Sequence, residues 1–292
     1  MYKVFVLKYW TEPHHQTKNR FLLQKPNDFK YFELVDDIEI ADFIIILDRI
    51  VDRNLLSKRS KNSKVFLMQR EPTYVGNLDK SLINICDYHF LYENNNNITF
   101  VAWWLDYNYE DLKKLKYEDL EKKFDHICIT SNKNGLYGHR LRNQWLSKIQ
   151  DMIHIDFYGK NLKHVYKNYK GIPEDFCESN TVNRIIGKNI IGNYHKSFSF
   201  DNGQQRNFIT RVNEDFLMWT LPLYWGCPNI DEIYPKNSYR YIDIKKSITK
   251  ELIEYIKEPV TKDELLGIEE ARLLVLDKYN FWFYIKDKIE SL

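Results

Sequence analysis

The sequence predicts an α/β fold made of two doubly wound, Rossmann-like domains that face a cleft. Short apolar runs rich in β-branched and aromatic residues alternate with longer helical or polar stretches, which is the pattern of βαβ units. The alternation occurs twice, once on each side of a highly charged segment at residues 109–123. With 292 residues, the chain is long enough for two such domains. We therefore expect an N-terminal domain over residues 1–118 and a C-terminal domain over residues 119–292, whose last helix returns to the domain junction.

The N-terminal domain is expected to contain five strands. One of them, DFIIIL, is apolar at successive positions, as in a parallel strand that is buried on both faces. Most of the strands are separated by enough chain for a crossover. The five runs are residues 3–7 (KVFVL), 42–47 (DFIIIL), 64–68 (KVFLM), 87–91 (DYHFL) and 99–103 (TFVAW). The charged segment 109–123 has few core positions and predicts a solvated helix or an interdomain connection.

The C-terminal domain repeats the pattern, with an amphipathic helix expected over residues 140–153. From residue 248 onward the sequence is mainly helical, and residues 269–289 carry a dense aromatic group. The strands are expected at residues 125–130 (DHICIT), 155–158 (IDFY), 197–200 (SFSF), 220–225 (TLPLYW) and 241–244 (YIDI).

The composition is that of a globular protein with a net charge of only +2, whereas dedicated nucleic-acid binders carry a strong basic excess. None of the four cysteines forms a C-x-x-C pair. Cys86, Cys128 and Cys227 lie in or beside apolar runs, so we expect core thiols, no disulfides and a reducing compartment. No run approaches the roughly 18 apolar residues that span a bilayer, and the N-terminus lacks the features of a signal peptide. These observations predict a cytoplasmic protein with no nucleic-acid partner.

Motifs of several common enzyme classes are absent from the sequence. There is no P-loop, no G-x-G-x-x-G dinucleotide fingerprint, no H-E-x-x-H and no G-x-S-x-G elbow. The histidines and cysteines are dispersed, and the adjacent His14 and His15 are expected in a solvated loop. The sequence therefore predicts neither a metal nor another cofactor.

The segment KSFSFDNGQQRNFITRVNEDFLMWTLPLYWGCPNI, residues 196–230, combines two apolar runs with polar residues at their ends. The strand SFSF runs into the turn of Asp201 and Asn202, and the second run ends at Gly226 in a Tyr-Trp-Gly bend. Ligands of doubly wound sheets bind outside the carboxyl ends of the strands. The residues that directly follow each strand are therefore the candidates for a site.

Several blocks of the sequence, taken in order, resemble the family 10 glycosyltransferases, the α1,3/4-fucosyltransferase family. The resemblance extends from about residue 3 to residue 289 and implies a GT-B fold. The matching blocks are QREP at 69–72, ITSNKNGLYGHRLR at 129–142, FDN at 200–202, TR at 210–211, LPLYWGCP at 221–228 and NSYRYIDI at 237–244.

The resemblance implies transfer of a sugar, usually L-fucose, from a guanosine diphosphate donor to an acceptor hydroxyl, with inversion. The leaving diphosphate gains negative charge in the transition state, which a metal or fixed cationic side chains must meet. The sequence offers no convincing Asp-x-Asp metal site. Arg142 matches the family's phosphate-contacting arginine at the opening of a helix, whose N-terminus favours anions. Arg211 stands where the family has a lysine and keeps the charge. The alternative is that both are ordinary surface arginines.

The resemblance also implies a general base. Glu71 matches the family glutamate with that role, and Pro72 holds it in an extended turn. The alternative is a solvated glutamate at the end of a strand. Asp48, which follows the FIIIL strand, is the next candidate for the base.

At the donor site, Asn202 matches a family asparagine, and Asp201 replaces the glutamate before it. Thr210 departs from the family, which has a glutamate there, and Asn207 stands where some members have a tyrosine. These departures leave the donor sugar open. Gly226 is expected to meet a backbone requirement at the bend.

Three functions follow from these residues. The first is an inverting, metal-independent transferase that moves fucose from GDP-fucose to a glycan acceptor. The second is the same fold with another nucleotide-sugar donor, and the third is a catalytically silent carbohydrate- or nucleotide-binding protein. The combination of Glu71, Arg142 and Arg211 argues against the third, because a protein that only binds needs no base. The acceptor is expected at loops of the N-terminal domain, foremost residues 11–27, and the aromatic last helix leaves peripheral membrane contact as an alternative to packing at the junction.

Overall fold

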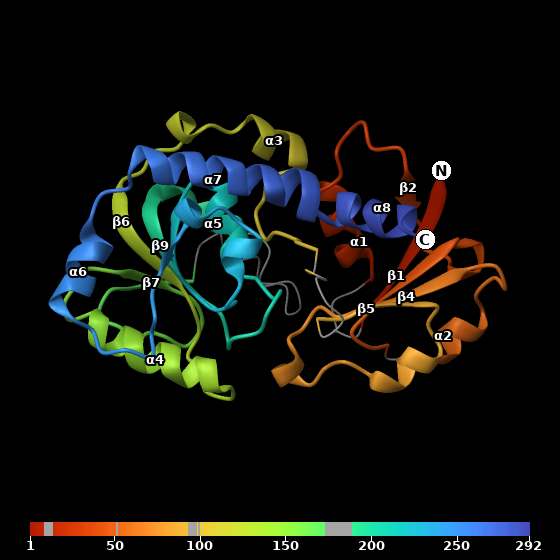
Figure 1. The fold of residues 1–292 in the computed structure, drawn as a ribbon, viewed down its shortest axis with the longest axis horizontal. Helices are drawn as coiled ribbons and strands as arrows, with labels where there is room; N and C mark the ends of the chain where they lie inside the picture. Colours follow the sequence, from red (N-terminus) through yellow and green to blue (C-terminus); the bar gives the residue numbers. More distant parts are fainter. Residues whose placement is uncertain (9–13, 51, 93–97, 99, 173–188) are drawn as a thin grey trace. The chain divides into compact units, whose positions relative to one another are not determined.

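The computed structural model describes residues 1–8, 14–50, 52–92, 98, 100–172 and 189–292. The chain forms two compact units, one of Met1–Ala102 with Tyr279–Leu292 and one of Trp103–Lys278 (Figure 1). This division differs from the expected domains 1–118 and 119–292 in two places. The second unit starts 16 residues earlier, at Trp103, and the last helix belongs to the first unit.

The first unit contains a fully parallel sheet in the order β2-β1-β3-β4-β5. Side chains of the central strand alternate between two apolar clusters, with Phe43 and Ile45 on one face and Ile44 and Ile46 on the other. This explains why the central run is β-branched throughout. The strands are β1 Tyr2–Lys8, β2 Phe32–Leu34, β3 Phe43–Leu47, β4 Lys64–Met68 and β5 Tyr88–Phe90.

Helices cover both faces of this sheet. The helices α1 His14–Leu23 and α8 Phe281–Glu290 lie on one face, and α2 Asn54–Ser57 lies on the other. Short 3-10 helices fill the connections: η1 Ile38–Ile40, η2 Thr73–Val75 and η3 Lys80–Asn84.

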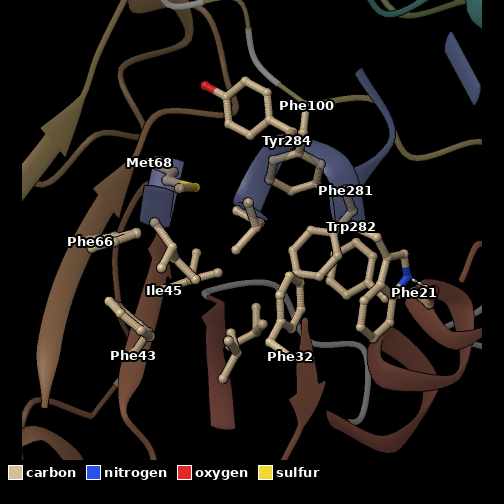
Figure 2. Packing of buried hydrophobic residues seen from close by; sticks show 14 of the residues in the cluster. Phe21, Phe32, Phe43, Ile45, Phe66, Met68, Phe100, Phe281, Trp282 and Tyr284 are labelled. Atoms are coloured by element: carbon tan, nitrogen blue, oxygen red, sulfur yellow. Dashed lines mark hydrogen bonds between the residues drawn. The ribbon is translucent and has the colours of Figure 1, made fainter. Parts of the chain in front are cut away.

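The aromatic group at the end of the sequence lies in the core of the first unit (Figure 2). Phe281 stacks on Phe21 with ring centroids 4.1 Å apart, and Trp282 stacks on Phe32 at 4.8 Å. The indole Nε1 of Trp282 also donates to the carbonyl of Phe21 at 2.6 Å. Because Phe281 and Trp282 are completely buried, they offer no exposed aromatic face for a membrane.

The second unit contains a six-stranded parallel sheet in the order β11-β10-β9-β6-β7-β8. Its strands are β6 Phe124–Ile129, β7 Asp156–Tyr158, β8 Tyr169–Gly171, β9 Tyr194–Phe200, β10 Leu221–Trp225 and β11 Arg240–Tyr241. Its α-helices are α3 Tyr109–Lys114, α4 Tyr137–Ile149, α5 Asn213–Leu217, α6 Lys250–Lys257 and α7 Lys262–Leu274. The remaining turns are η4 Tyr117–Asp119, η5 Asn189–Asn193, η6 Ile230–Glu232, η7 Lys236–Ser238 and the π-helical η8 Val275–Tyr279. The helices α4 and α6 pack on one face of the sheet, and α5 and α7 contact β10 from the other (Figure 1).

Three expectations about local structure are wrong. Of the expected strand 99–103, the described residues 100–103 are not part of the sheet, since Val101 makes only a single bridge to Asn280, and residue 99 lies outside the described part of the chain. The fifth strand of this sheet is instead β2, which the sequence did not indicate. The helix α1 begins at His14, so His14 and His15 do not lie in a loop, and most of the expected acceptor loop 11–27 is helical. Residues 11–13 lie outside the described part of the chain.

Cys86, Cys128 and Cys227 are buried free thiols, as expected for core residues, and Cys177 lies outside the described residues. Within the described ranges, no helix combines the length and the apolar character that crossing a bilayer requires.

Candidate functional site

The sheet of the second unit reverses its strand order between β6 and β9. The strands β6, β7 and β8 follow one another in one direction, and β9, β10 and β11 follow in the other. Such a reversal opens a crevice at the carboxyl ends of the two central strands, where ligands of doubly wound folds bind. A cavity of about 20 Å³, room for about one water molecule, lies there. Its lining includes Thr130 after β6, Ser199 and Phe200 at the end of β9, and both Arg142 and Arg211.

Arg142 projects from α4 into this cavity and is almost completely buried, at 1% exposure. Its partners are distant: Nη1 donates to Oδ1 of Asn202 at 3.3 Å and Nη2 to the carbonyl of Ser131 at 3.4 Å. Among the described residues, Nε has no hydrogen-bond partner. Because α4 begins at Tyr137, Arg142 lies in the second turn and does not open the helix as expected. Its guanidinium, and not the end of the helix, supplies the positive charge.

Arg211 lines the same cavity and is half-buried. Its guanidinium makes no hydrogen bond or ion pair with any residue that the structure describes. Burial, and next the charge of Arg211, lower the pKa of Arg142 to about 10. The two positive charges repel each other in this buried crevice, so a bound anion would stabilise both.

Other arginines of the second unit are much better satisfied. Arg240 is equally buried, but it pairs with Glu264 at 2.6 Å and donates to three carbonyl groups. Arg272 is buried and donates to the carbonyls of Leu112, Leu115 and Leu217. Arg206, in the same segment as Arg211, is exposed and forms a bidentate pair with Glu232 at 2.9 and 3.0 Å. The shortage of partners is therefore specific to Arg142 and Arg211 among these five.

Asp201 follows β9 and is completely buried. Its Oδ1 accepts from the Thr210 hydroxyl at 3.0 Å, and its Oδ2 accepts from the Tyr224 hydroxyl at 2.5 Å. Burial raises the pKa of Asp201 to about 6 despite these bonds and the nearby charge of Arg211. The Asp201 carboxylate thus holds Thr210, the residue before Arg211, in place.

Gly226 is required by this arrangement, but through close approach and not through a left-handed backbone. A Cβ at this position would lie 2.1 Å from Oδ2 of Asp201 and 2.4 Å from the hydroxyl of Tyr224. Tyr224 and Trp225 are completely buried, so both are core residues. Asn207 is also structural, since it exchanges hydrogen bonds of 2.9 and 3.0 Å with Asn229.

Gly138 brings α4 against the turn after β9. A Cβ there would lie only 2.2 Å from the carbonyl oxygen of Asn202. This contact places Arg142 within reach of Asn202. His139, on the same helix, has a lowered pKa because it is buried and because Arg142 lies nearby, and both effects favour the neutral ring. Sequence analysis missed His139 and Thr130, and only their position after β6 could have indicated them.

The first unit carries the other candidates at the carboxyl ends of β3 and β4. Glu71 is half-buried in the turn after β4, and its carboxylate makes no hydrogen bond or ion pair within the described part of the chain. Asp48 follows β3 and is completely buried. Burial raises the pKa of Asp48 to about 6, and the charge of Glu71 adds to this rise. The structure thus brings Arg142, Arg211, Asp201, Asn202 and Thr210 together in one unit and carries Glu71 in the other.

Comparison with known proteins decides the family. The model of the family described as "Glycosyltransferase family 10 (fucosyltransferase) C-term" matches residues 119–266, half of the chain. The chain belongs to glycosyltransferase family 10. The matched region contains every candidate residue of the second unit.

A related sequence agrees with this membership, and solved structures show the fold. A GDP-fucose protein O-fucosyltransferase 3 from Xenopus laevis is 25% identical over 125 residues, which is 42% of this chain and 26% of that protein. The chain therefore spans only about a quarter of the length of this relative. A crystal structure of an α1,3-fucosyltransferase with GDP-fucose is 16% identical, with a TM-score of 0.56, and the match covers 99% of this chain and 89% of the other. A second α1,3-fucosyltransferase structure gives a TM-score of 0.54 at 17% identity, over 96% and 82% of the two chains. The family 10 member described here therefore has the GT-B fold, with two α/β domains that each contain a parallel sheet.

Proposed function

We propose that this family 10 member is an inverting glycosyltransferase that moves L-fucose from GDP-fucose to an acceptor hydroxyl without a metal ion. The observation that carries the proposal is the pair of poorly satisfied arginines, Arg142 and Arg211, at the strand reversal of the second unit. Two fixed guanidinium groups are well suited to a diphosphate, because each presents several N–H donors to phosphate oxygens.

In the proposed reaction, the acceptor oxygen forms a bond to the anomeric carbon of fucose from the face opposite the diphosphate. The bond between that carbon and the diphosphate oxygen breaks, and GDP leaves with the electron pair. The acceptor proton passes to the carboxylate of Glu71. Arg142 and Arg211 stabilise the charge that develops on the leaving group, which is the usual task of preorganised donors. Asp201 and Asn202 act at the donor as well, with Asp201 holding Thr210 and Asn202 holding Arg142.

The donor and the acceptor are the finer parts of the proposal. GDP-fucose is supported by the family and by the names of its relatives. Another nucleotide sugar is the alternative, because Thr210 stands where a glutamate is expected from the resemblance to the family. For the acceptor, a glycan hydroxyl is our first choice, and the name of the Xenopus relative supports a protein hydroxyl as the second.

The proposal predicts that Arg142→Ala and Arg211→Ala weaken GDP binding. A lost hydrogen bond to a charged group costs about 1.5–3 kcal/mol, so each variant should bind GDP at least tenfold more weakly. The measurement is thermal stabilisation by GDP, with EDTA present, because a ligand that binds the native state raises its melting temperature. Arg206→Ala is the matched control, since Arg206 lies in the same segment but is exposed and paired with Glu232.

Three outcomes would count against parts of this proposal. Wild-type affinity in both variants would show that the arginines are not donor ligands. Stronger stabilisation by UDP than by GDP would favour the alternative donor. Binding of GDP-fucose without any release of GDP would favour a catalytically silent binding protein.

A further inference from the structure

We propose that Asp48 is a positioning residue that fixes the turn carrying Glu71. The inference rests on the proposed role of Glu71 as the general base. It assigns Asp48 a part in the reaction that is distinct from proton transfer, because Asp48 is completely buried whereas Glu71 is only half-buried.

The geometry of the turn supports this role directly. Oδ1 of Asp48 accepts from the backbone N–H of Arg70 at 2.8 Å and from the backbone N–H of Glu71 at 3.0 Å. The backbone of Asp48 is itself anchored, since its N–H donates to the carbonyl of Met68 at 2.9 Å and its carbonyl accepts from the N–H of Asp79 at 2.9 Å. One carboxylate oxygen at the end of β3 therefore holds the first two peptide groups of the turn after β4.

A second side chain completes the arrangement from the other side. Nε2 of Gln69 donates to the carbonyl of Glu71 at 3.1 Å, while its Oε1 accepts from the N–H of Tyr92 at 3.2 Å. The hydroxyl of Tyr92 donates to the carbonyl of Arg70 at 3.1 Å. Both backbone polar groups of Glu71 are thus fixed, and only its carboxylate is left unpaired among the described residues.

Two features of Asp48 are energetically unfavourable. Its backbone is left-handed, with φ 61°, which is unusual for a residue with a side chain. Its Oδ2 is buried and has no hydrogen-bond partner among the described residues. The charged groups that face its carboxylate are Glu71, which opposes its ionisation, and Arg70, which favours it. Strained backbone and buried polar groups without partners are concentrated at functional sites.

Two substitutions separate the acceptor oxygen from the other properties of Asp48. Asp48→Gly keeps the left-handed backbone and removes the acceptor, whereas Asp48→Asn keeps both the backbone and one acceptor oxygen. Asp87→Gly is the matched control, because Asp87 also accepts a backbone N–H in the same sheet, that of Val65 at 2.7 Å, but before β5 and away from the turn.

Two measurements decide the outcome. One is hydrogen exchange of the Arg70 and Glu71 amides, and the other is release of GDP from GDP-fucose with water as the acceptor. We expect Asp48→Gly to accelerate exchange at both amides and to lower kcat about 10²-fold, as misplacement of a reacting group does, with KM for GDP-fucose unchanged. Asp48→Asn should keep wild-type amide exchange and turnover, and Asp87→Gly should match the wild type in both.

The inference is overturned if Asp48→Gly exchanges or turns over like the wild type, or if Asp48→Asn is as impaired as Asp48→Gly. If Asp48→Gly does not fold, Asp48→Asn decides alone: loss of amide protection or of turnover in that variant refutes the role. If the wild-type protein releases no GDP, the proposed function fails, and the exchange measurement still decides whether Asp48 fixes the turn.

Discussion

At the scale of single residues, Glu71 combines a fixed backbone with an unpaired carboxylate. Its N–H and carbonyl are both hydrogen-bonded, and Pro72 follows it at φ −65°. A general base needs this combination, because its carboxylate must reach a substrate proton in a defined direction and must not be occupied by the protein.

Glu71→Gln tests this role with almost no change of shape. The amide cannot take up a proton, so kcat for GDP release should fall by roughly 10²–10⁴-fold, the usual contribution of a general base. GDP affinity should stay at the wild-type value, since the candidate donor ligands belong to the other unit. The two quantities are measured by single-turnover kinetics and thermal stabilisation. Near-normal turnover would show that another group accepts the proton.

The individual arginines show which site residues can be predicted from the sequence and which cannot. Arg206 and Arg211 are five positions apart in one loop segment, and nothing local distinguishes them. The difference is Glu232, which lies 26 residues from Arg206 and pairs with it. Likewise, the sequence indicates Asp48 only as a second candidate for the base. Its hydrogen bonds to the turn after β4 cannot be predicted locally, because they depend on the register of two parallel strands.

At the scale of elements, Gly138 lets the start of α4 approach the turn after β9. Gly138→Ala should improve helix propensity by about 1 kcal/mol, but the new Cβ would lie 2.2 Å from the carbonyl oxygen of Asn202, a backbone atom that cannot move aside cheaply. Overpacking of this kind costs about 1–3 kcal/mol. We therefore expect a lower melting temperature and weaker GDP binding.

Gly135→Ala provides the control for this substitution. Gly135 lies three residues earlier, and no atom lies within 4 Å of a Cβ added there. This variant should keep wild-type stability and GDP affinity. Equal behaviour of the two variants would mean that the approach of α4 to Asn202 is not needed for binding.

Elements with a strong apolar pattern are predicted well, whereas two of the short strands, β2 and β8, are missed. The expected strands 42–47 and 64–68 correspond to β3 Phe43–Leu47 and β4 Lys64–Met68, because central strands buried on both faces need long apolar runs. The strands β2 and β8 have three residues each, too few to show a period. Residues 99–103 have a strand-like composition, yet Phe100 and Val101 pack beside α8, a contact across about 180 residues that no local pattern reveals.

At the scale of the whole molecule, each unit has a buried carboxylate directly after a central strand, at the carboxyl end of its sheet. Asp48 in the first unit and Asp201 in the second are both completely buried, and burial raises the pKa of each to about 6. Such groups make stability depend on pH, because the folded and unfolded states bind protons differently. The pH dependence of stability therefore arises from residues at the carboxyl ends of the strands, where the candidate site residues also lie.

The sign of this dependence gives the last prediction. Since the pKa of Asp48 is about 6 in the folded state and 3.8 in its ordinary state, the folded protein holds the proton more tightly. The stability contributed by the protonated carboxyl is complete below about pH 4 and is lost as the pH rises to about 6. Asp48→Asn has no proton to lose, so its unfolding free energy relative to the wild type should increase by about 2 kcal/mol between pH 4 and pH 7. Urea unfolding across this range measures the difference. Asp79→Asn is the control: its difference from the wild type should stay nearly constant across this range, because the hydrogen bond from Ser81 lowers the pKa of Asp79 and the stability of its ionised form is lost only below about pH 4. A difference between Asp48→Asn and the wild type that stays constant with pH would show that the Asp48 carboxylate is not desolvated in the folded protein.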